Sequence, residues 1–418
     1  MNKLKGAAII GQSGGPTSVI NASAAGVFIE ALGQENITRV YGAAHGIRGI
    51  LNEEFYDINQ EDMKELELLK TTPSSLIGSV RYKLKDLKVD DSEYKKLLEV
   101  FKKYNIRYFF YNGGNDSMDT CNKISKFMKT SGYECYCMGV PKTIDNDLAV
   151  TDHCPGYASA AKYVATTLME IRYDATVYDT PMVAVVEIMG RNAGWLTAAA
   201  QLAVYKGAGP DLIYLPEIPF DLDKFYADVE KKYKEKNGQV IIAVSEGIKT
   251  KDGKYVPELA SDNLAKDSFG HAQLGGTASV LANLLKDRLN VKVRAIEFSL
   301  IQRCAQHLAS KVDVEEAFNA GREAVKAAVS GITDYMIGFK RTYDKNGNYV
   351  CEYIKIPLEE VANAEKTVPL EWINKDGTGL TDDYVKYALP LIQGNAAAPL
   401  EDGLPRFAKL KKVFVEKE

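Results

Sequence analysis

The feature that most constrains the fold is an alternation of short apolar, β-rich runs with segments of helical periodicity. Across the first 160 residues the candidate strands are 7–10, 38–41, 108–111 and 136–140, and the candidate helices are 19–32, 94–104 and 119–128. Such an alternation is typical of βαβ units wound around a parallel sheet. The first part of the chain is therefore predicted to form an α/β domain.

The alternation resumes after residue 157 and predicts a second wound sheet. The expected elements are helix 158–171, strand 182–188, helix 196–204, strand 211–215, helix 222–234 and strand 240–244, then helix 278–289, strand 294–298 and helix 314–329. Gly331 should end the last helix. Runs 337–343 and 349–356 predict a hairpin, because Asn346-Gly347 suits a tight turn, and we expect it to decorate the fold. A chain of 418 residues is long enough for two such domains with a cleft between them.

Charge and hydropathy exclude two classes of partner. Lys and Arg number 52 against 56 Asp and Glu, and a net charge of -4 gives no basic field for nucleic acid or an anionic membrane. The longest apolar runs, such as 183–188, fall far short of the roughly 20 residues of a membrane span. Residues 1–5 lead straight into a strand and leave no room for a signal peptide. A cytoplasmic location is expected.

Three polar loops follow predicted strands, where α/β enzymes bind their ligands. Loop 11–17 is glycine-rich and precedes a helix, which suits either an anion or a purely structural turn. Loop 113–117 has the same setting but contains Asp116, which could equally cap the helix. Loop 141–147 combines a lysine, a threonine and two aspartates, enough for a general base, a metal contact and a phosphate contact, although polar turns are common. Together at the edge of one sheet, the three loops favour a phosphate site.

At this point the chain resembles a known family, the phosphofructokinases. The resemblance covers residues 5–330 and rests on motifs in matching order: Gly14-Gly15, loop 113–117, Thr143-Ile144-Asp145-Asn146-Asp147, Met189-Gly190-Arg191, Glu246 and Gln302-Arg303. It implies two doubly wound, Rossmann-like α/β domains with the active site in the cleft between them. The diphosphate-binding domain would comprise residues 1–158 and about 302–375. The fructose 6-phosphate domain would comprise about 159–301 and the C-terminal segment 376–418.

The resemblance also implies roles for individual residues. Asp145 would be the general base for the sugar 1-hydroxyl, with Lys142, Thr143 and Arg81 acting on the transferred phosphoryl group. The implied diphosphate-binding residues are Gly14, Gly15, Asp116 and Lys142. The implied sugar-binding residues are Thr143, Asp145, Met189, Gly190, Arg191, Glu246, Arg294, Leu300, Gln302 and Arg303.

Two positions indicate the phosphoryl donor. Where ATP-dependent members of the family carry glycine, this chain has Asp116 and Lys142, as is typical of the pyrophosphate-dependent branch. Asp116 would occupy the space of a nucleotide α-phosphate and repel its charge, whereas Lys142 would attract pyrophosphate. The resemblance therefore implies reversible phosphorylation of fructose 6-phosphate by pyrophosphate, a step of glycolysis.

The chain departs from the family pattern at four positions. His45 replaces a tyrosine in loop 42–46. Asn115 stands where most members have a magnesium-binding aspartate, so Mg²⁺ would be shared among Asn115, Asp116 and Asp147. Leu300 replaces a polar residue. Met182 replaces an arginine that, in short bacterial members, reaches the sugar phosphate of a neighbouring subunit.

Two other functions compete with the pyrophosphate-dependent enzyme. The first is an ATP-dependent 6-phosphofructokinase, which Asp116 and Lys142 together oppose. The second is a non-catalytic regulatory subunit that binds sugar phosphate, which Asn115 favours and the presence of Asp145, Asp147 and Lys142 opposes. By analogy with the family we expect a homodimer or homotetramer.

Overall fold

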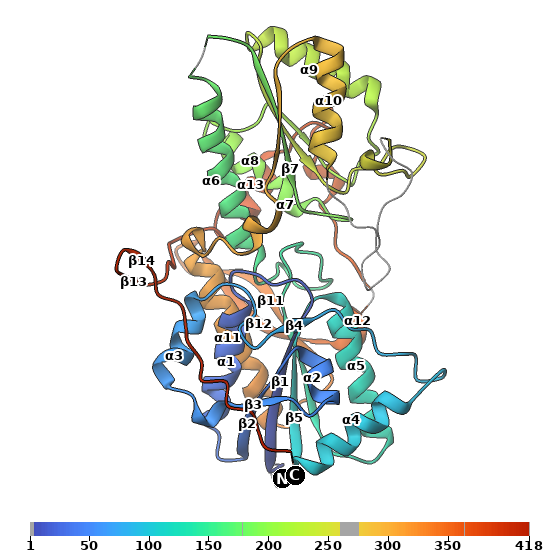
Figure 1. Cartoon of the computed structure of the whole chain (residues 1–418), viewed down its shortest axis with the longest axis vertical. Coiled ribbons are helices and arrows are strands. Elements are labelled where there is room, and N and C mark those ends of the chain that lie inside the picture. The colour runs from blue at the N-terminus through green and yellow to red at the C-terminus, as the bar shows by residue number, and fades with distance from the viewer. Residues whose placement is uncertain (1–3, 178, 260–275, 363, 418) are drawn as a thin grey trace.

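The computed structural model of the chain describes residues 4–177, 179–259, 276–362 and 364–417. They form two lobes, each built on its own β-sheet, with both chain ends at the outer end of the first lobe (Figure 1). The strands and helices expected from the alternation are present, with their ends shifted by a few residues. The predicted two-domain α/β fold is thus confirmed.

The first lobe contains an eight-stranded sheet in the order β12-β11-β6-β5-β1-β2-β3, with β4 also paired to β1. Its centre is parallel, and the pairs at the two edges, β2 with β3 and β11 with β12, are antiparallel. The central strands are buried along almost their whole length, which explains their continuous apolar sequence. The strands are β1 (Gly6–Ser13), β2 (Ile37–Ala43), β3 (Phe55–Asp57), β4 (Ser79–Val80), β5 (Ile106–Gly113), β6 (Tyr136–Pro141), β11 (Tyr335–Tyr343) and β12 (Tyr349–Pro357).

Helices cover both faces of this sheet (Figure 1). Helices α1 (Ile20–Leu32) and α11 (Lys311–Val329) cross very closely. A Cβ at Gly26 would lie 2.0 Å from the backbone oxygen of Phe318, and a Cβ at Gly321 would lie 2.1 Å from the backbone oxygen of Ser23. Only glycine fits at such a crossing. The helices are α1 (Ile20–Leu32), α2 (Gly46–Leu51), α3 (Met63–Leu68), α4 (Ser92–Lys103), α5 (Asn115–Thr130), α11 (Lys311–Val329) and α12 (Leu358–Val361), with short 3-10 turns η1 (Ile58–Gln60) and η2 (Leu69–Thr71).

The hairpin β11–β12 is not a decoration. It forms as predicted, with Gly347 at a φ of 80°, and Gly331 ends α11 at a φ of 93°. However, β11 pairs in parallel with β6, through Tyr335 opposite Met138, and so extends the main sheet. The expectation was wrong because a hairpin signal identifies two paired strands but not their further neighbour.

The second lobe contains a four-stranded parallel sheet in the order β10-β7-β9-β8. The helix predicted at 196–204 is divided into two at Ala199, where bonds of the 3-10 type link Ala199 to Leu196 and Leu202 to Ala199. The strands are β7 (Met182–Ile188), β8 (Leu212–Tyr214), β9 (Gln239–Ser245) and β10 (Val293–Glu297). The helices are α6 (Tyr157–Ala175), α7 (Trp195–Ala198), α8 (Ala200–Tyr205), α9 (Leu222–Glu235), α10 (Thr277–Leu289) and α13 (Asp382–Ala388), with η3 (Val256–Leu259), η4 (Ser299–Arg303), η5 (Gln306–Leu308) and η6 (Leu370–Trp372).

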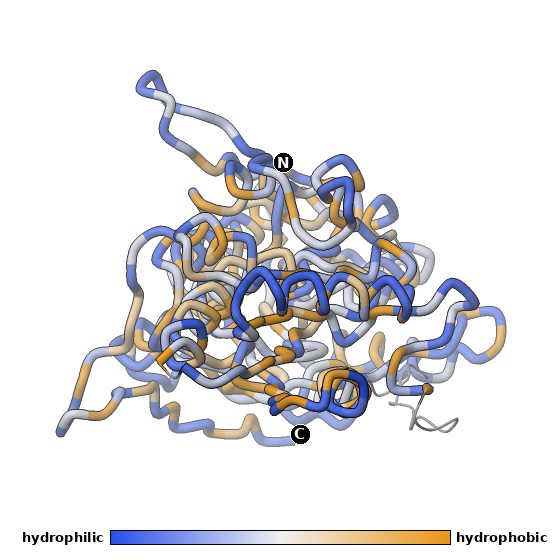
Figure 2. Tube along the Cα trace, turned by 90° about the horizontal axis from the view of Figure 1, so that it is seen from above, coloured by the Kyte–Doolittle hydropathy of each residue, from blue (hydrophilic) through white to orange (hydrophobic). Residues whose placement is uncertain are grey.

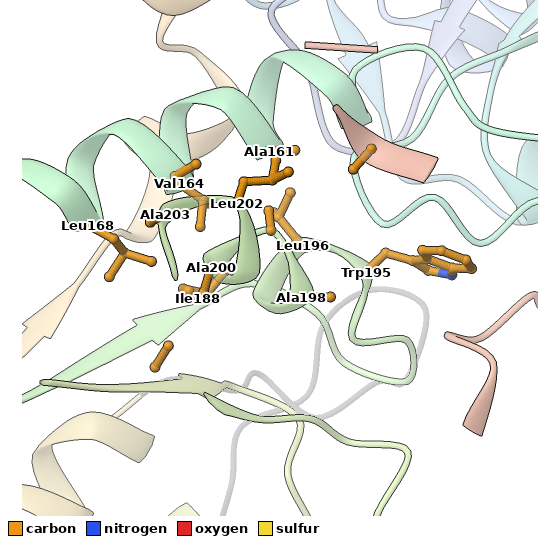
Figure 3. Close-up of a cluster of buried hydrophobic side chains, with 14 of the residues drawn as sticks. Ala161, Val164, Leu168, Ile188, Trp195, Leu196, Ala198, Ala200, Leu202 and Ala203 are labelled. Atoms are coloured by element: carbon orange, nitrogen blue, oxygen red, sulfur yellow. The ribbon is translucent and has the colours of Figure 1, made fainter. Parts of the chain in front are cut away.

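The second lobe has an alanine-rich core between α6, α7 and α8, in which small side chains allow the helices to pack closely (Figure 3). Hydrophilic residues dominate the outer turns and loops, and hydrophobic residues lie inside (Figure 2). In the described part of the chain, no helix combines the length and apolar character needed to cross a bilayer.

The C-terminal part of the chain packs against both lobes. Residues 368–391 contribute to the core of the second lobe. After the small hairpin of β13 (Leu400–Glu401) and β14 (Leu404–Pro405), the chain returns to the first lobe, where Val415 donates to the backbone oxygen of Phe55 and Val413 accepts from the amide of Asp57. The predicted division had assigned all of 376–418 to the second lobe and 368–375 to the first, so the observed packing differs at both places.

Candidate active site

A cleft of about 580 Å³ opens between the lobes, at the carboxyl ends of the parallel strands. Each of the three polar loops singled out in the sequence reaches it, following β1, β5 and β6 respectively. Most of the predicted site residues line it: Gly14, Gly15, Arg81, Asn115, Asp116, Lys142, Thr143, Asp145, Asp147, Met189, Arg191, Glu246 and Arg303.

The turn after β1 gathers three cationic side chains. Gly14 has a φ of 78°, and Lys142 donates from Nζ to the backbone oxygen of Gly15 at 2.7 Å. A Cβ at Gly15 would lie 3.1 Å from Nη1 of Arg303 and 4.0 Å from Nη2 of Arg81. Glycine at this position keeps open the space between the arginines, and an anion there would meet positive charge on several sides.

Lys142 lies at the buried centre of this group. Burial lowers the pKa of Lys142 to about 8, with Arg81 and Arg303 acting in the same direction and Asp145 opposing them. When an anionic ligand binds beside a buried ammonium group that is surrounded by other cations, it strongly stabilises the charged form of that group. The position is therefore suited to a polyanionic ligand and would be unfavourable for a neutral ligand.

Thr143 and Asp145 form the turn that follows β6. The backbone amide of Asp145 donates to Oγ1 of Thr143 at 3.1 Å, which fixes the direction in which the aspartate leaves the turn. Burial raises the pKa of Asp145, while Lys142 and Arg191 oppose the rise. A carboxylate with a raised pKa in a cleft has the character of a general base.

Asn115 and Asp147 form a pair beside that turn. Asn115 donates from Nδ2 to Oδ2 of Asp147 at 3.1 Å, and the Oδ1 atoms of both residues are buried without a hydrogen-bond partner. Burial, with Asp145 adding to it, raises the pKa of Asp147 to about 7. Two unpartnered oxygens beside a cleft that is suited to phosphate groups fit a hard divalent cation. In the described ranges no group of three or more His, Cys, Asp and Glu side chains could hold a metal, so a cation here would rest on Asn115 and Asp147 with ligands from outside the protein.

Asp116 does not cap its helix through its side chain. The residue before α5 is Gly114, which makes no side-chain cap, and Asp116 lies exposed in the first turn of the helix, facing the cleft. The helix-capping alternative considered for this residue is thus not what the structure shows.

The second lobe supplies the opposite wall. Met189 and Arg191 follow β7, and Glu246 follows β9, so both strands end at the cleft. The amide of Gly190 donates to Oε1 of Glu246 at 3.4 Å. Burial raises the pKa of Glu246 to about 7, and the charge of Asp145 adds to the effect.

Four predicted sugar-binding residues do not line the cleft. Gly190 does not line the cleft although Met189 and Arg191 do. Gln302 is buried, accepting from the amide of Met189 at 3.2 Å and donating to the backbone oxygen of Ser299 at 3.0 Å. Leu300 is 54% exposed on η4. Arg294 lies on the edge strand β10, in a separate pocket of about 300 Å³ that it shares with Met182. Its distance from the cleft follows from the position of β10 at the edge of the sheet.

Sequence reasoning missed three cleft residues: Asn192, Ala193 and Glu365. Asn192 donates from Nδ2 to the carboxylate of Glu365 at 3.2 and 3.3 Å, which links the two lobes. Glu365 also pairs through its backbone with Leu148, close to the turn of Asp145. No local signal marks Glu365, since it stands in an ordinary polar stretch more than 200 residues from the turn it meets.

Known proteins resemble this chain along its length. The family model described as Phosphofructokinase matches residues 7–297. A protein of Halomonas elongata is 44% identical over 98% of this chain and 97% of its own, and one of Xanthomonas campestris is 46% identical over 97% and 96%. Both are named pyrophosphate--fructose 6-phosphate 1-phosphotransferase.

A solved structure agrees with these relatives. The pyrophosphate-dependent phosphofructokinase of Nitrosospira multiformis superposes with a TM-score of 0.88 at 42% identity, covering 98% of each chain. The motifs that meet in the cleft are the ones on which the sequence resemblance rested. By motif, by full-length similarity and by fold, this chain belongs to the phosphofructokinase family.

Proposed function

We propose that the chain transfers a phosphoryl group reversibly between pyrophosphate and the 1-hydroxyl of fructose 6-phosphate, giving fructose 1,6-bisphosphate and phosphate in glycolysis. The observation that carries the proposal is that Lys142 and Asp116 both line the donor side of the cleft. The relatives named for this same reaction, at 44% and 46% identity over nearly the whole chain, support it.

The choice of donor follows from charge and volume. Asp116 faces the cleft from the first turn of α5, where a nucleotide would need room beyond its second phosphate. At about 4 Å, each pair of like charges costs on the order of 1 to 4 kcal/mol, which corresponds to a loss of ATP affinity of about 5-fold to 800-fold. Lys142 offers pyrophosphate a cation at the Gly14–Gly15 turn. Attraction of one donor and repulsion of the other together set specificity.

The transfer itself needs alignment and charge neutralisation more than covalent chemistry. Asp145 takes the proton of the sugar 1-hydroxyl as that oxygen bonds to phosphorus, and the bond between phosphorus and the bridging oxygen of pyrophosphate breaks to release phosphate. Lys142, Arg81 and Arg303 face the charge that develops, and Thr143 contacts the transferred group. The diphosphate lies against the first lobe and the sugar against the second.

Phosphofructokinases require a divalent metal, and we assign Mg²⁺ to the pair of Asn115 and Asp147, with Asp116 nearby. Their two buried, unpartnered oxygens fit a cation that is held in addition by phosphate oxygens and water. When bound, Mg²⁺ neutralises phosphate charge and orients the pyrophosphate. An amide in place of a carboxylate reduces the negative charge of the protein ligands by one. This suits a cation that arrives already bound to a polyanion.

Fructose 6-phosphate is held by Met189, Arg191, Glu246 and Arg303, with Gln302 and Gly190 supporting Met189 and Glu246 from behind. We propose a homodimer or homotetramer, in which Arg294 on the outer edge strand serves the sugar phosphate of a neighbouring copy. We also propose a cytoplasmic location, since both substrates are charged metabolites of central metabolism.

The test is formation of fructose 1,6-bisphosphate by the purified protein with Mg²⁺, comparing pyrophosphate and ATP at equal concentrations. We expect turnover with pyrophosphate and at most about a fifth of that rate with ATP. Asp145→Asn is the control for contaminating activity. Turnover with ATP alone would refute the assignment of Asp116, and binding of fructose 6-phosphate without turnover with either donor would support the regulatory-subunit alternative.

A further inference from the structure

The turn that carries Asp145 and Asp147 is shaped by the residue between them. Asn146 is completely buried and adopts a φ of 55°, a left-handed conformation that asparagine tolerates better than most residues. Its Oδ1 accepts from the amide of Cys154 at 2.9 Å, and its Nδ2 donates to the hydroxyl of Tyr387 at 2.8 Å. The direction in which the two aspartates point therefore depends on both partners of Asn146.

Tyr387 comes from the far end of the chain. It lies on α13, and its hydroxyl donates in turn to the backbone oxygen of Asp152 at 2.8 Å, so that one oxygen atom joins the two halves of the loop between β6 and α6. Its ring packs in the second-lobe core, 5.2 Å from the ring of Trp195 and 5.4 Å from that of Trp372. A side chain packed in the core of the second lobe thus holds a loop of the first.

Neighbouring contacts hold the backbone and ring of Tyr387 and the loop beside its hydroxyl. Arg341 donates to the backbone oxygen of Tyr387 at 3.0 Å and lies over its ring, 4.9 Å from the centroid. Lys366 donates to the backbone oxygens of Thr151 at 3.0 Å and Asp152 at 2.7 Å, beside the hydroxyl. All three side chains belong to the part of the chain that follows the region matched by the family model.

We propose that Tyr387 is a positioning residue for the phosphoryl transfer, acting through Asn146 to hold Asp145 and Asp147 in their working directions. The inference rests on the proposed function and deepens it. Removal of the hydroxyl leaves the amide of Asn146 buried without an acceptor, while the oxygen of Asp152 keeps Lys366. The turn can recover a partner for Asn146 only by shifting, and a displacement of about 1 Å at reacting groups costs on the order of 100-fold in rate.

Tyr387→Phe tests this, and Tyr384→Phe is its matched control. Tyr384 lies on the same helix, is completely buried, and uses its hydroxyl to bond the backbone oxygen of Trp195 at 3.1 Å and the hydroxyl of Tyr157 at 2.5 Å, away from the turn. We expect kcat to fall about 10- to 100-fold in Tyr387→Phe with the KM for fructose 6-phosphate changed less than about twofold. In Tyr384→Phe we expect a similar loss of melting temperature with kcat nearly unchanged.

A double-mutant cycle identifies the route of the effect. Asn146→Gly removes the amide but tolerates the left-handed backbone, and the double variant with Tyr387→Phe should lose no more kcat than Asn146→Gly alone. Additive losses would overturn the proposed link, as would equal kcat values in Tyr387→Phe and Tyr384→Phe. If Tyr387→Phe does not fold, a wild-type kcat in Asn146→Gly overturns it instead. An inactive wild type would refute the proposed function, and an active one with unaffected variants would refute only this inference.

Discussion

The two walls of the cleft differ in how complete they are. The donor wall, on the first lobe, brings Lys142, Arg81 and Asp145 together around the Gly14–Gly15 turn within a single chain. The sugar wall, on the second lobe, has Arg191 and Glu246 in place but leaves Arg294 in a separate pocket. The contrast teaches that the two walls are built differently: one chain assembles the proposed reacting groups, whereas in the proposed homo-oligomer binding of the sugar phosphate would also depend on how copies of the chain meet.

The largest effect should come from Asp145→Asn on the donor wall. The substitution keeps the size of the side chain but removes the proposed general base, so kcat should fall about 10²- to 10⁴-fold. Binding of fructose 6-phosphate, measured by calorimetry, should stay nearly unchanged because the sugar wall is intact. If binding and turnover fell together, the two walls would not be separable in the way described.

The next largest effect is expected of Asp116→Gly combined with Lys142→Gly. Loss of the ammonium group should lower the pyrophosphate rate about 100-fold or more, and loss of the carboxylate should open room for a nucleotide. Initial rates with pyrophosphate and with ATP measure the change in preference. Each single variant serves as a control, and a donor preference unchanged in the double variant would contradict the account of selection.

A smaller effect is expected on the sugar wall, and it tests whether this wall needs a residue outside the cleft of its own chain. Arg294→Ala should raise the KM for fructose 6-phosphate about 10- to 100-fold, since a charged hydrogen bond contributes about 1.5 to 3 kcal/mol, and should leave the KM for pyrophosphate unchanged. Lys292→Ala, an exposed cation two residues away, is the matched control. A normal KM in Arg294→Ala would show that the sugar wall is complete within one chain.

The smallest effect is a pH dependence. The pKa of Glu246 on the sugar wall is raised to about 7, so its protonation lowers activity as the pH falls below about 7, and activity is kept above it. The value of kcat/KM for fructose 6-phosphate should decrease by up to about tenfold per pH unit on the acid side for each required carboxylate. If the acid limb persists in Glu246→Gln, it belongs to the donor wall; if it disappears, it belongs to the sugar wall.

The residues of the donor wall could be predicted from the sequence, but the residues that hold this wall in position could not. Strand-end loops carry local signals, such as the glycines at 14 and 15 or the aspartates at 145 and 147, and parallel strands bring such loops together at one edge. Glu365 and Tyr387 carry no such signal, because their roles arise only when the late part of the chain folds against the turn. For the same reason the β11–β12 hairpin was recognised but its place beside β6 was not.

The path of the chain also limits how such an enzyme can be taken apart. The backbone passes from the first lobe to the second, returns through α11 and the β11–β12 hairpin, crosses again for residues 368–391 and ends on the first lobe at Val415. No single truncation of the chain therefore yields either lobe complete and by itself. A crossover near residue 157 would transfer the donor-wall loops of one relative without Glu365 and Tyr387, the late residues that pack against their turn, so we expect such hybrids to lose the fit between the loops and these two residues.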